Sequence, residues 1–174
     1  MLTVDFDRFP VEPGERILDM GCGGGRHAFA LYRQGADVVA LDMDEKELKD
    51  VADMFEAMAA EGEVPAGATA TTVRGNAYSL PFEDNSFDKI IAAEVMEHLP
   101  EDTLAMAELT RVLKPGGIIA VSVPRWLPEK VCWALSDDYH EVEGGHVRIY
   151  RGDLLKDRLT RTGLELIGDH HAHG

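Results

Sequence analysis

The feature that most constrains the fold is a glycine-rich segment, ILDMGCGGGRH, at residues 17–27. An apolar run typical of a buried strand leads into it, and a helical pattern follows it. Three alternate glycines, Gly21, Gly23 and Gly25, allow the backbone of this turn to come close to a ligand beside a helix N-terminus. A turn that only connects two elements needs one glycine, so the sequence predicts a small-ligand site here.

The rest of the chain alternates short β-like runs with longer helical ones, the pattern of parallel βαβ units. We expect strands at residues 16–20, 37–41, 69–73, 87–93, 118–123 and 164–167. We expect helices at 26–34 (ended by Gly35), from a capping box of Asp44 and Glu47 onward, at 101–113 (ended by 114–117), and at 153–162. Residues 125–150 break the pattern and are interpreted as an insertion on the substrate side. The predicted fold is a doubly wound, mostly parallel Rossmann-like α/β sheet with helices on both faces, in a single domain over residues 1–174.

The composition indicates one globular domain in the cytoplasm. Of 174 residues, 45% are hydrophobic and 28% charged, which is enough apolar material for a core. The net charge of −15 disfavours nucleic acid and anionic membranes as partners. The only cysteines are Cys22 and Cys132, and no apolar run approaches the ~18 residues of a membrane span or forms a signal peptide. The sequence leaves open whether the chain forms a homo-oligomer.

Two features of the glycine turn indicate a ligand other than a dinucleotide. The dinucleotide fingerprint requires a glycine at position 26, where this sequence has Arg26. Asp19 would be unfavourable beside a pyrophosphate, whereas its carboxylate suits a ligand with an ammonium group. The predicted ligand is therefore cationic and carries no phosphate.

These residues resemble the class I S-adenosylmethionine-dependent methyltransferases. The pattern Asp19-x-Gly21-x-Gly23-x-Gly25 matches the first motif of that family, whose loop, here including Cys22, wraps the methionine part of S-adenosylmethionine. The resemblance implies that the chain uses S-adenosylmethionine and releases S-adenosylhomocysteine.

The resemblance continues after the second predicted strand, at Asp42 and Met43. Asp42 follows Asp19 at about the spacing, roughly 20 residues, expected of a carboxylate that binds ribose hydroxyls. A lone Asp at the end of a strand is often a helix cap, but Asp44 is the capping candidate here. Asp42 is therefore expected to hold the ribose, with Met43 beside it.

A third stretch, from Gly75 through 80–88, is similar to the branch of the family that methylates small molecules and quinones. Asn76 stands where many relatives have Asp, and the resemblance implies that Asn76 faces the adenine while the Ala77 amide bonds the ring edge. Glu94, in the segment 94–98, is assigned to the cofactor site as well. The resemblance covers about residues 15–167, but the usual helix before the first strand and the usual last strand are missing. Whether 145–150, another subunit or residues absent from this sequence fill that place stays open, and the chain is expected to be a fragment in the last case.

Methyl transfer from a sulfonium is an in-line displacement that releases a neutral thioether, so positioning carries much of the catalysis. An oxygen or nitrogen acceptor, which we expect rather than carbon, must lose a proton. The candidate bases are His98, His140 and His146, the last two in the insertion, with a purely structural role as the alternative for each. The sequence does not identify the small-molecule acceptor.

Metal binding is not expected, although an acidic run between Asp137 and His146 and three terminal histidines (His170, His171, His173) offer ligands, because their spacing is not that of a metal site. Trp126 and Trp133 either line a substrate pocket or pack the insertion. Two rival functions remain: a non-catalytic module that binds S-adenosylmethionine, and a nicotinamide oxidoreductase, which Arg26 and Asp19 disfavour.

Overall fold

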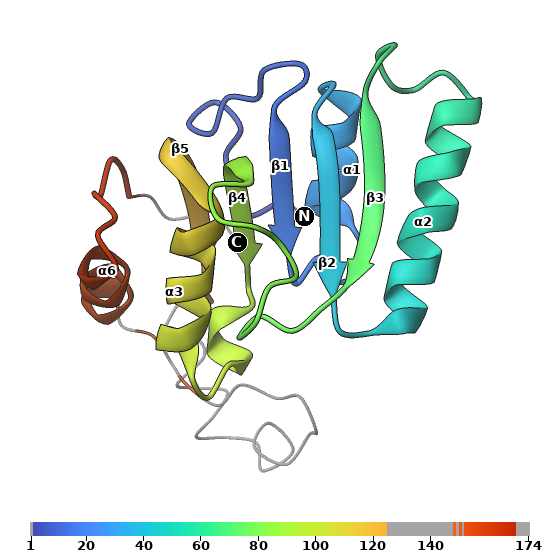
Figure 1. Ribbon diagram of the computed structural model, residues 1–174. Helices are drawn as coiled ribbons and strands as arrows, with labels where there is room; N and C mark the ends of the chain where they lie inside the picture. Colours follow the sequence, from blue (N-terminus) through green and yellow to red (C-terminus); the bar gives the residue numbers. More distant parts are fainter. Residues whose placement is uncertain (1, 125–147, 149, 151, 170–174) are drawn as a thin grey trace.

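The computed structural model describes residues 2–124, 148, 150 and 152–169 (Figure 1). Within them, five parallel strands form one sheet in the order β3-β2-β1-β4-β5. The strands are β1 (Arg16–Met20), β2 (Asp37–Asp42), β3 (Thr69–Arg74), β4 (Phe87–Ala93) and β5 (Leu113–Ser122). The helices are α1 (Arg26–Arg33), α2 (Glu45–Ala60), α3 (Asp102–Val112) and α6 (Gly152–Arg161), with a short 3-10 turn, η1 (Met96–His98).

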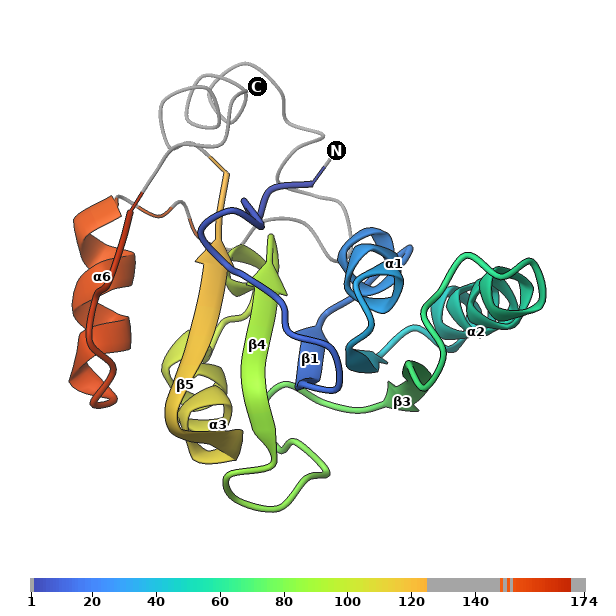
Figure 2. The ribbon, with the colours of Figure 1, turned by 90° about the horizontal axis from the view of Figure 1, so that it is seen from above.

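Helices cover both faces of the sheet, and Figure 2 shows α1 and α3 on opposite sides of it. α1 and α2 pack on one face, where Leu31 and Phe55 share a buried cluster with Ile17. α3 and α6 pack on the other face, where Leu109 shares a cluster with Leu18. Consecutive strand residues point to opposite faces, so the fully buried pair at 17 and 18 shows a strand covered on both sides. This confirms the predicted doubly wound α/β fold.

The predicted helix signals have the expected effects, with one difference at α2. The Asp44 side chain accepts the N–H groups of Lys46 and Glu47 and caps α2. In a full capping box the Asp44 N–H would bond to Glu47, but here it donates to Asp42 Oδ1 at 3.0 Å. Gly35, with φ 91°, follows the end of α1 as predicted.

Two expectations for the carboxyl-terminal part were wrong. The fifth strand was expected at 118–123, but β5 begins at Leu113, directly after α3. Residues 114–117 therefore lie inside the strand, and a register shift between Phe87 and Lys89 of β4 accommodates them. Residues 164–167 form no strand, because no described strand lies beyond β5 to pair with them, and the Ile167 side chain is 75% exposed. Among the described helices, none has the length and apolar character needed to cross a membrane.

Candidate functional site

The candidate site lies where β1 and β4 end side by side. These strands are neighbours in the sheet, but the chain leaves β1 toward α1 on one face and β4 toward α3 on the other. In open parallel sheets, ligands bind beyond the carboxyl ends of the strands at such a switch point. The glycine turn follows β1 and Glu94 follows β4, so the switch point brings the two predicted motifs together.

The glycines of the turn differ in what surrounds them. Gly21, Gly23 and Gly25 all have positive φ, at 72°, 47° and 78°, which favours glycine. A Cβ on Gly21 would overlap the Val95 side chain, and a Cβ on Gly25 would lie 2.6 Å from Phe29 Cζ. A Cβ on Gly23 would have no neighbour within 4 Å. Packing therefore requires the outer two glycines, whereas Gly23 borders open space.

Asp42 holds this turn from the end of β2. Its Oδ2 accepts the Gly23 N–H at 2.8 Å, and its Oδ1 accepts the Asp44 N–H at 3.0 Å. A carboxylate has about four acceptor positions, so Asp42 keeps acceptor capacity for a ligand. Met43 follows it with an exposed side chain. The structure thus gives Asp42 a role in shaping the turn that the sequence did not predict.

Asp19 is the buried charge of the site. Its side chain is 2% exposed, and its Oδ2 accepts no hydrogen bond from any described residue. Burial raises the pKa of Asp19 to about 7, against the lowering effects of a hydrogen bond from the Ala28 backbone and of the Arg26 charge. A buried carboxylate with an unpaired oxygen is costly unless a cation is supplied. The buried Asp19 carboxylate therefore fits a ligand that carries a positive charge and donates a hydrogen bond.

Cys22 contributes backbone and packing to the turn. Its side chain is buried in the cluster on the α1 side of the sheet. The N–H groups of Gly21 and Cys22 both donate to Leu41 O, at 2.7 and 3.0 Å, which ties the turn to β2. Burial raises the pKa of the Cys22 thiol, and the nearby carboxylates of Asp19 and Asp42 raise it further. These surroundings favour the protonated thiol over the thiolate.

Glu94 pairs with the first residue of α1. Its Oε2 lies 2.6 Å from Nη2 of Arg26, so the ion pair joins the end of β4 to the beginning of α1. Glu94 has a φ of 57°, unusual for a residue other than glycine, and its N–H donates to Ser122 O at 2.9 Å. The sequence showed Arg26 only as a departure from the dinucleotide fingerprint, with no signal for its partner.

Asn76 and Ala77 follow β3, at the same carboxyl edge. Asn76 Oδ1 accepts the Tyr78 N–H at 2.9 Å, so this oxygen is used in a local turn. Ala77 is buried. Their positions beside the end of β2 are compatible with the predicted adenine contacts, because a side-chain amide has two N–H donors and a second acceptor position on its oxygen for further hydrogen bonds.

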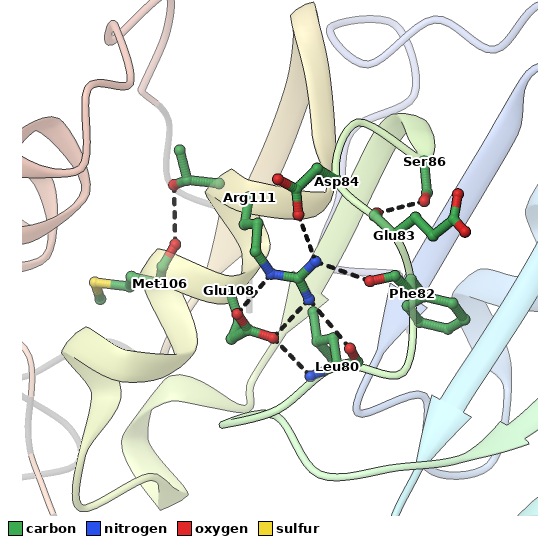
Figure 3. A network of polar contacts seen from close by, with 9 residues as sticks. Leu80, Phe82, Glu83, Asp84, Ser86, Met106, Glu108 and Arg111 are labelled. Atoms are coloured by element: carbon green, nitrogen blue, oxygen red, sulfur yellow. Dashed lines mark hydrogen bonds and ion pairs between the residues drawn. The ribbon is translucent and has the colours of Figure 1, made fainter.

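The residues after this turn are held by α3, a contact that the sequence did not reveal. Figure 3 shows Arg111 at the centre of it. Arg111 donates to Leu80 O at 3.1 Å and Phe82 O at 2.8 Å, and it pairs with Asp84 at 2.9 Å. Glu108 accepts from Arg111 and also takes the Leu80 N–H at 2.7 Å. These bonds fix the loop that carries Asn76 and Ala77.

Of the candidate bases, only His98 lies within the described residues. It ends η1 after β4, half-buried, and its backbone N–H donates to Val95 O at 3.0 Å. His140 and His146 fall outside the described residues, as do Trp126 and Trp133. The residues that the structure describes contain no cluster of three metal-ligating side chains. The acidic run at 137–146 and the terminal histidines lie outside those residues.

A buried ionic cluster contacts the residues that directly follow His98. Asp102 begins α3, is 2% exposed, and binds the Tyr150 hydroxyl, Arg158 and, at 2.8 Å, Arg148. Arg148 also donates to the carbonyl oxygens of residues 99 and 100, at 3.2 and 2.9 Å. The sequence did not predict this cluster, whose members are up to 56 positions apart.

His27 has a structural role beside the turn. Its Nε2 accepts the N–H groups of Thr3 and Val4, at 3.2 and 3.4 Å, and burial lowers its pKa to about 4. The Thr3 hydroxyl also lies 2.9 Å from the Ser122 hydroxyl at the end of β5. A neutral His27 thus holds the amino-terminal segment against the site.

Known proteins are similar to this chain in sequence and in fold. A family model described as a methyltransferase domain matches residues 18–121. The sterol 24-C-methyltransferase of Yarrowia lipolytica is 32% identical over 167 residues, which cover 91% of this chain and 40% of that protein. The ubiquinone biosynthesis O-methyltransferase of Hahella chejuensis is 35% identical over 135 residues, which cover 77% of this chain and 54% of that protein. The crystal structure of the (4+2)-cyclase SpnF matches with a TM-score of 0.71 and 26% identity, over 94% of this chain and 55% of that one.

The chain thus spans about half, or less, of the length of these curated relatives. The matched segment begins in β1 and ends in β5, so it contains the glycine turn, Asp42 and the ends of β3 and β4. The family model covers more than half of the chain, and the two relatives match it at more than 30% identity. On these grounds, the chain belongs to the methyltransferase domain family.

Proposed function

We propose that the chain is the catalytic domain of a methyltransferase that uses S-adenosylmethionine to methylate a small molecule. The observation that carries this proposal is the unpaired, buried Oδ2 of Asp19 beneath an open glycine turn. Membership in the methyltransferase domain family supports it. A dinucleotide would bring a pyrophosphate to the same carboxylate, which is why the nicotinamide alternative is not favoured.

In this proposal the residues at the carboxyl edge of the sheet each contact a different part of the ligand. Asp19 attracts the ammonium group, and the turn, Gly21, Cys22, Gly23 and Gly25, surrounds the methionine part. Asp42 accepts the ribose hydroxyls beside Met43, Asn76 and Ala77 border the adenine, and Glu94 closes the β4 side.

When bound, S-adenosylmethionine supplies a methyl group on a positively charged sulfur. The chain then has to orient the acceptor for in-line attack, exclude water and take a proton from an oxygen or nitrogen acceptor. His98, His140 and His146 are the proposed bases. Alanine at the base that acts should lower turnover roughly 10²–10⁴-fold while cofactor affinity stays nearly unchanged. The ubiquinone O-methyltransferase relative supports oxygen as the acceptor atom, and the sterol relative makes carbon the alternative that an assay must separate.

The binding part is tested by thermal denaturation with S-adenosylmethionine, S-adenosylhomocysteine and NAD. A ligand that binds only the folded protein adds RT ln(1 + [L]/Kd) to stability, so the first two should raise the melting temperature and NAD should not. Stabilisation by NAD alone would overturn the proposal.

The catalytic part is tested by transfer of a labelled methyl group to a metabolite extract. Labelled product and S-adenosylhomocysteine should form together. The similarity to a cyclase shows that this fold hosts other reactions as well. Cofactor binding without methyl transfer to any acceptor would favour the non-catalytic module.

A further inference from the structure

We propose that Arg148 is a positioning residue for methyl transfer. Its guanidinium holds the backbone carbonyl groups of Leu99 and Pro100, and so fixes the η1 turn that carries His98. The inference rests on the proposed function, in which His98 is one of the candidate bases.

The first support is the weakness of the η1 turn by itself. It follows β4 at the same edge of the sheet as the glycine turn (Figure 1). Its backbone bonds include the His98 N–H to Val95 O at 3.0 Å and the Leu99 N–H to Met96 O at 3.2 Å. A 3-10 turn has poorer hydrogen-bond geometry than an α-helix, and Pro100 has no N–H with which to extend it. The position of His98 therefore depends on support from outside the turn.

The second support is the pair of bonds that Arg148 makes just after His98. Its Nη1 donates to Leu99 O at 3.2 Å, and its Nη2 donates to Pro100 O at 2.9 Å. The donors of a guanidinium form a planar fork of fixed geometry, so one side chain sets the relative position of two consecutive carbonyl groups. Arg148 lies 49 positions after Leu99, so this support comes from a distant part of the chain.

The third support is that the guanidinium is itself held in place. It forms an ion pair of 2.8 Å with Asp102, whose carboxylate is buried at the beginning of α3. It also lies over the ring of Tyr150, 5.7 Å from the ring centre, and the Tyr150 hydroxyl lies 3.5 Å from Met96 O on the other side of the turn. Arg148 is thus a fixed point from which the turn is positioned.

Arg158 gives a matched control within the same cluster. It binds the same oxygen of Asp102, and its side chain is 25% exposed, against 24% for Arg148. Its contacts with the described residues do not include the carbonyl groups at positions 99 and 100. Arg158→Gln therefore removes a cation from Asp102 without touching the turn. Arg148→Lys does the reverse, because lysine keeps the charge but lacks the planar fork.

The first measurement is hydrogen exchange by NMR on the chain without ligand. Arg148→Gln and Arg148→Lys should speed exchange of the His98 and Leu99 amides at least about tenfold relative to the Leu18 amide, because bonds to a charged group are lost. The Leu18 amide lies in the buried strand β1 and reports global unfolding. Arg158→Gln should speed all three amides alike.

The second measurement is transfer of a labelled methyl group from saturating S-adenosylmethionine to a metabolite extract. Arg148→Lys should lower transfer roughly 10–100-fold, because a displacement of about 1 Å can have an effect of that size. Affinity for S-adenosylhomocysteine, measured by calorimetry, should stay nearly unchanged, and Arg158→Gln should keep the wild-type transfer rate. Since Arg148 acts through the turn, Arg148→Lys/His98→Ala should transfer little less than His98→Ala alone.

The outcomes separate the inference from the proposed function. Wild-type exchange at His98 and Leu99 in Arg148→Lys would overturn the inference, because the fork would then be dispensable. Equal effects of Arg158→Gln, additive losses in the double variant, or full transfer by His98→Ala would overturn it as well. In these cases the wild type still binds S-adenosylmethionine and transfers the label, so the proposed function stands. A wild type that does neither contradicts the proposed function and, with it, the catalytic role of Arg148.

Discussion

The two sides of the switch point are built in different ways. On the β1 and β2 side, the turn is held by bonds between residues close in sequence, from Gly21 and Gly23 to Leu41 and Asp42. On the β4 and β5 side, the corresponding support is the cluster around Asp102, whose partners lie 46 or more positions away. The first side can form once one βαβ unit is folded, whereas the second requires the whole described fold. Local and distant contacts should therefore fail independently when mutated.

The largest expected effect is on the β4 side. Asp102→Ala leaves Arg148 and Arg158 without their buried carboxylate and should lower the free energy of unfolding by about 3–5 kcal/mol. Urea denaturation measures this loss. Asp84→Ala, which removes an exposed partner of Arg111, should cost less than about 1 kcal/mol. Equal losses in the two variants would show that the Asp102 cluster gives no special support.

On the β1 side, Gly23→Val should act on binding more than on folding. A Cβ at this position meets no described atom within 4 Å, so the side chain fills space meant for the ligand. We expect affinity for S-adenosylmethionine to fall by at least about a hundredfold, or roughly 3 kcal/mol. Gly62→Val is the control, because Gly62 also has a positive φ, 73°, and open space. It should share the backbone strain of a β-branched residue at positive φ and keep full binding, and a Gly62→Val variant that loses binding would refute the argument.

Asp42 and Asp44 sharpen the comparison, because one carboxylate serves the turn and the other serves α2. Asp42→Ala should weaken cofactor binding by about 1.5–3 kcal/mol, since a charge-assisted bond and the Gly23 contact are lost together. Asp44→Ala should cost about 1 kcal/mol of stability through the lost helix cap, with nearly unchanged affinity. Calorimetry and thermal denaturation of both variants decide whether the roles are separate; wild-type affinity in Asp42→Ala would show that the Asp42 carboxylate does not contact the cofactor.

A further effect is a pH dependence centred on Asp19. Burial raises the pKa of Asp19 from 3.8 to about 7, so the folded protein favours the protonated form. Its contribution to stability is therefore fully present below about pH 4 and is lost as pH rises through 7. A cationic ligand favours the ionised form, so affinity for S-adenosylmethionine should fall about tenfold per unit as pH drops from 7 to 5. Asp19→Asn should bind weakly and show no such slope; a wild type without the slope contradicts the assigned contact.

Some residues of the site were predicted from the sequence and others were not. The difference again lies between contacts close in sequence and contacts between distant residues. The glycine turn with Asp19 and the capping role of Asp44 were predicted from spacing within a few residues, and Asp42 was predicted from its spacing of roughly 20 residues from Asp19. Arg111, which binds the loop after Asn76, had no such signal, because its partners are 27 to 31 positions away. The expected strand at 164–167 failed for a related reason, since a strand needs a neighbour and sequence pattern alone does not supply one.

The sequence by itself determined the parallel α/β fold, the glycine turn and the family resemblance, because strand and helix periodicity and backbone freedom are properties of short segments. Only the tertiary structure decided which charges meet. Asp19 is left with an unpaired buried oxygen, Glu94 is paired with Arg26, and Asp102 is shared by two arginines. Burial and the distances between charges depend on how separate elements pack, and electrostatic energies change steeply with both.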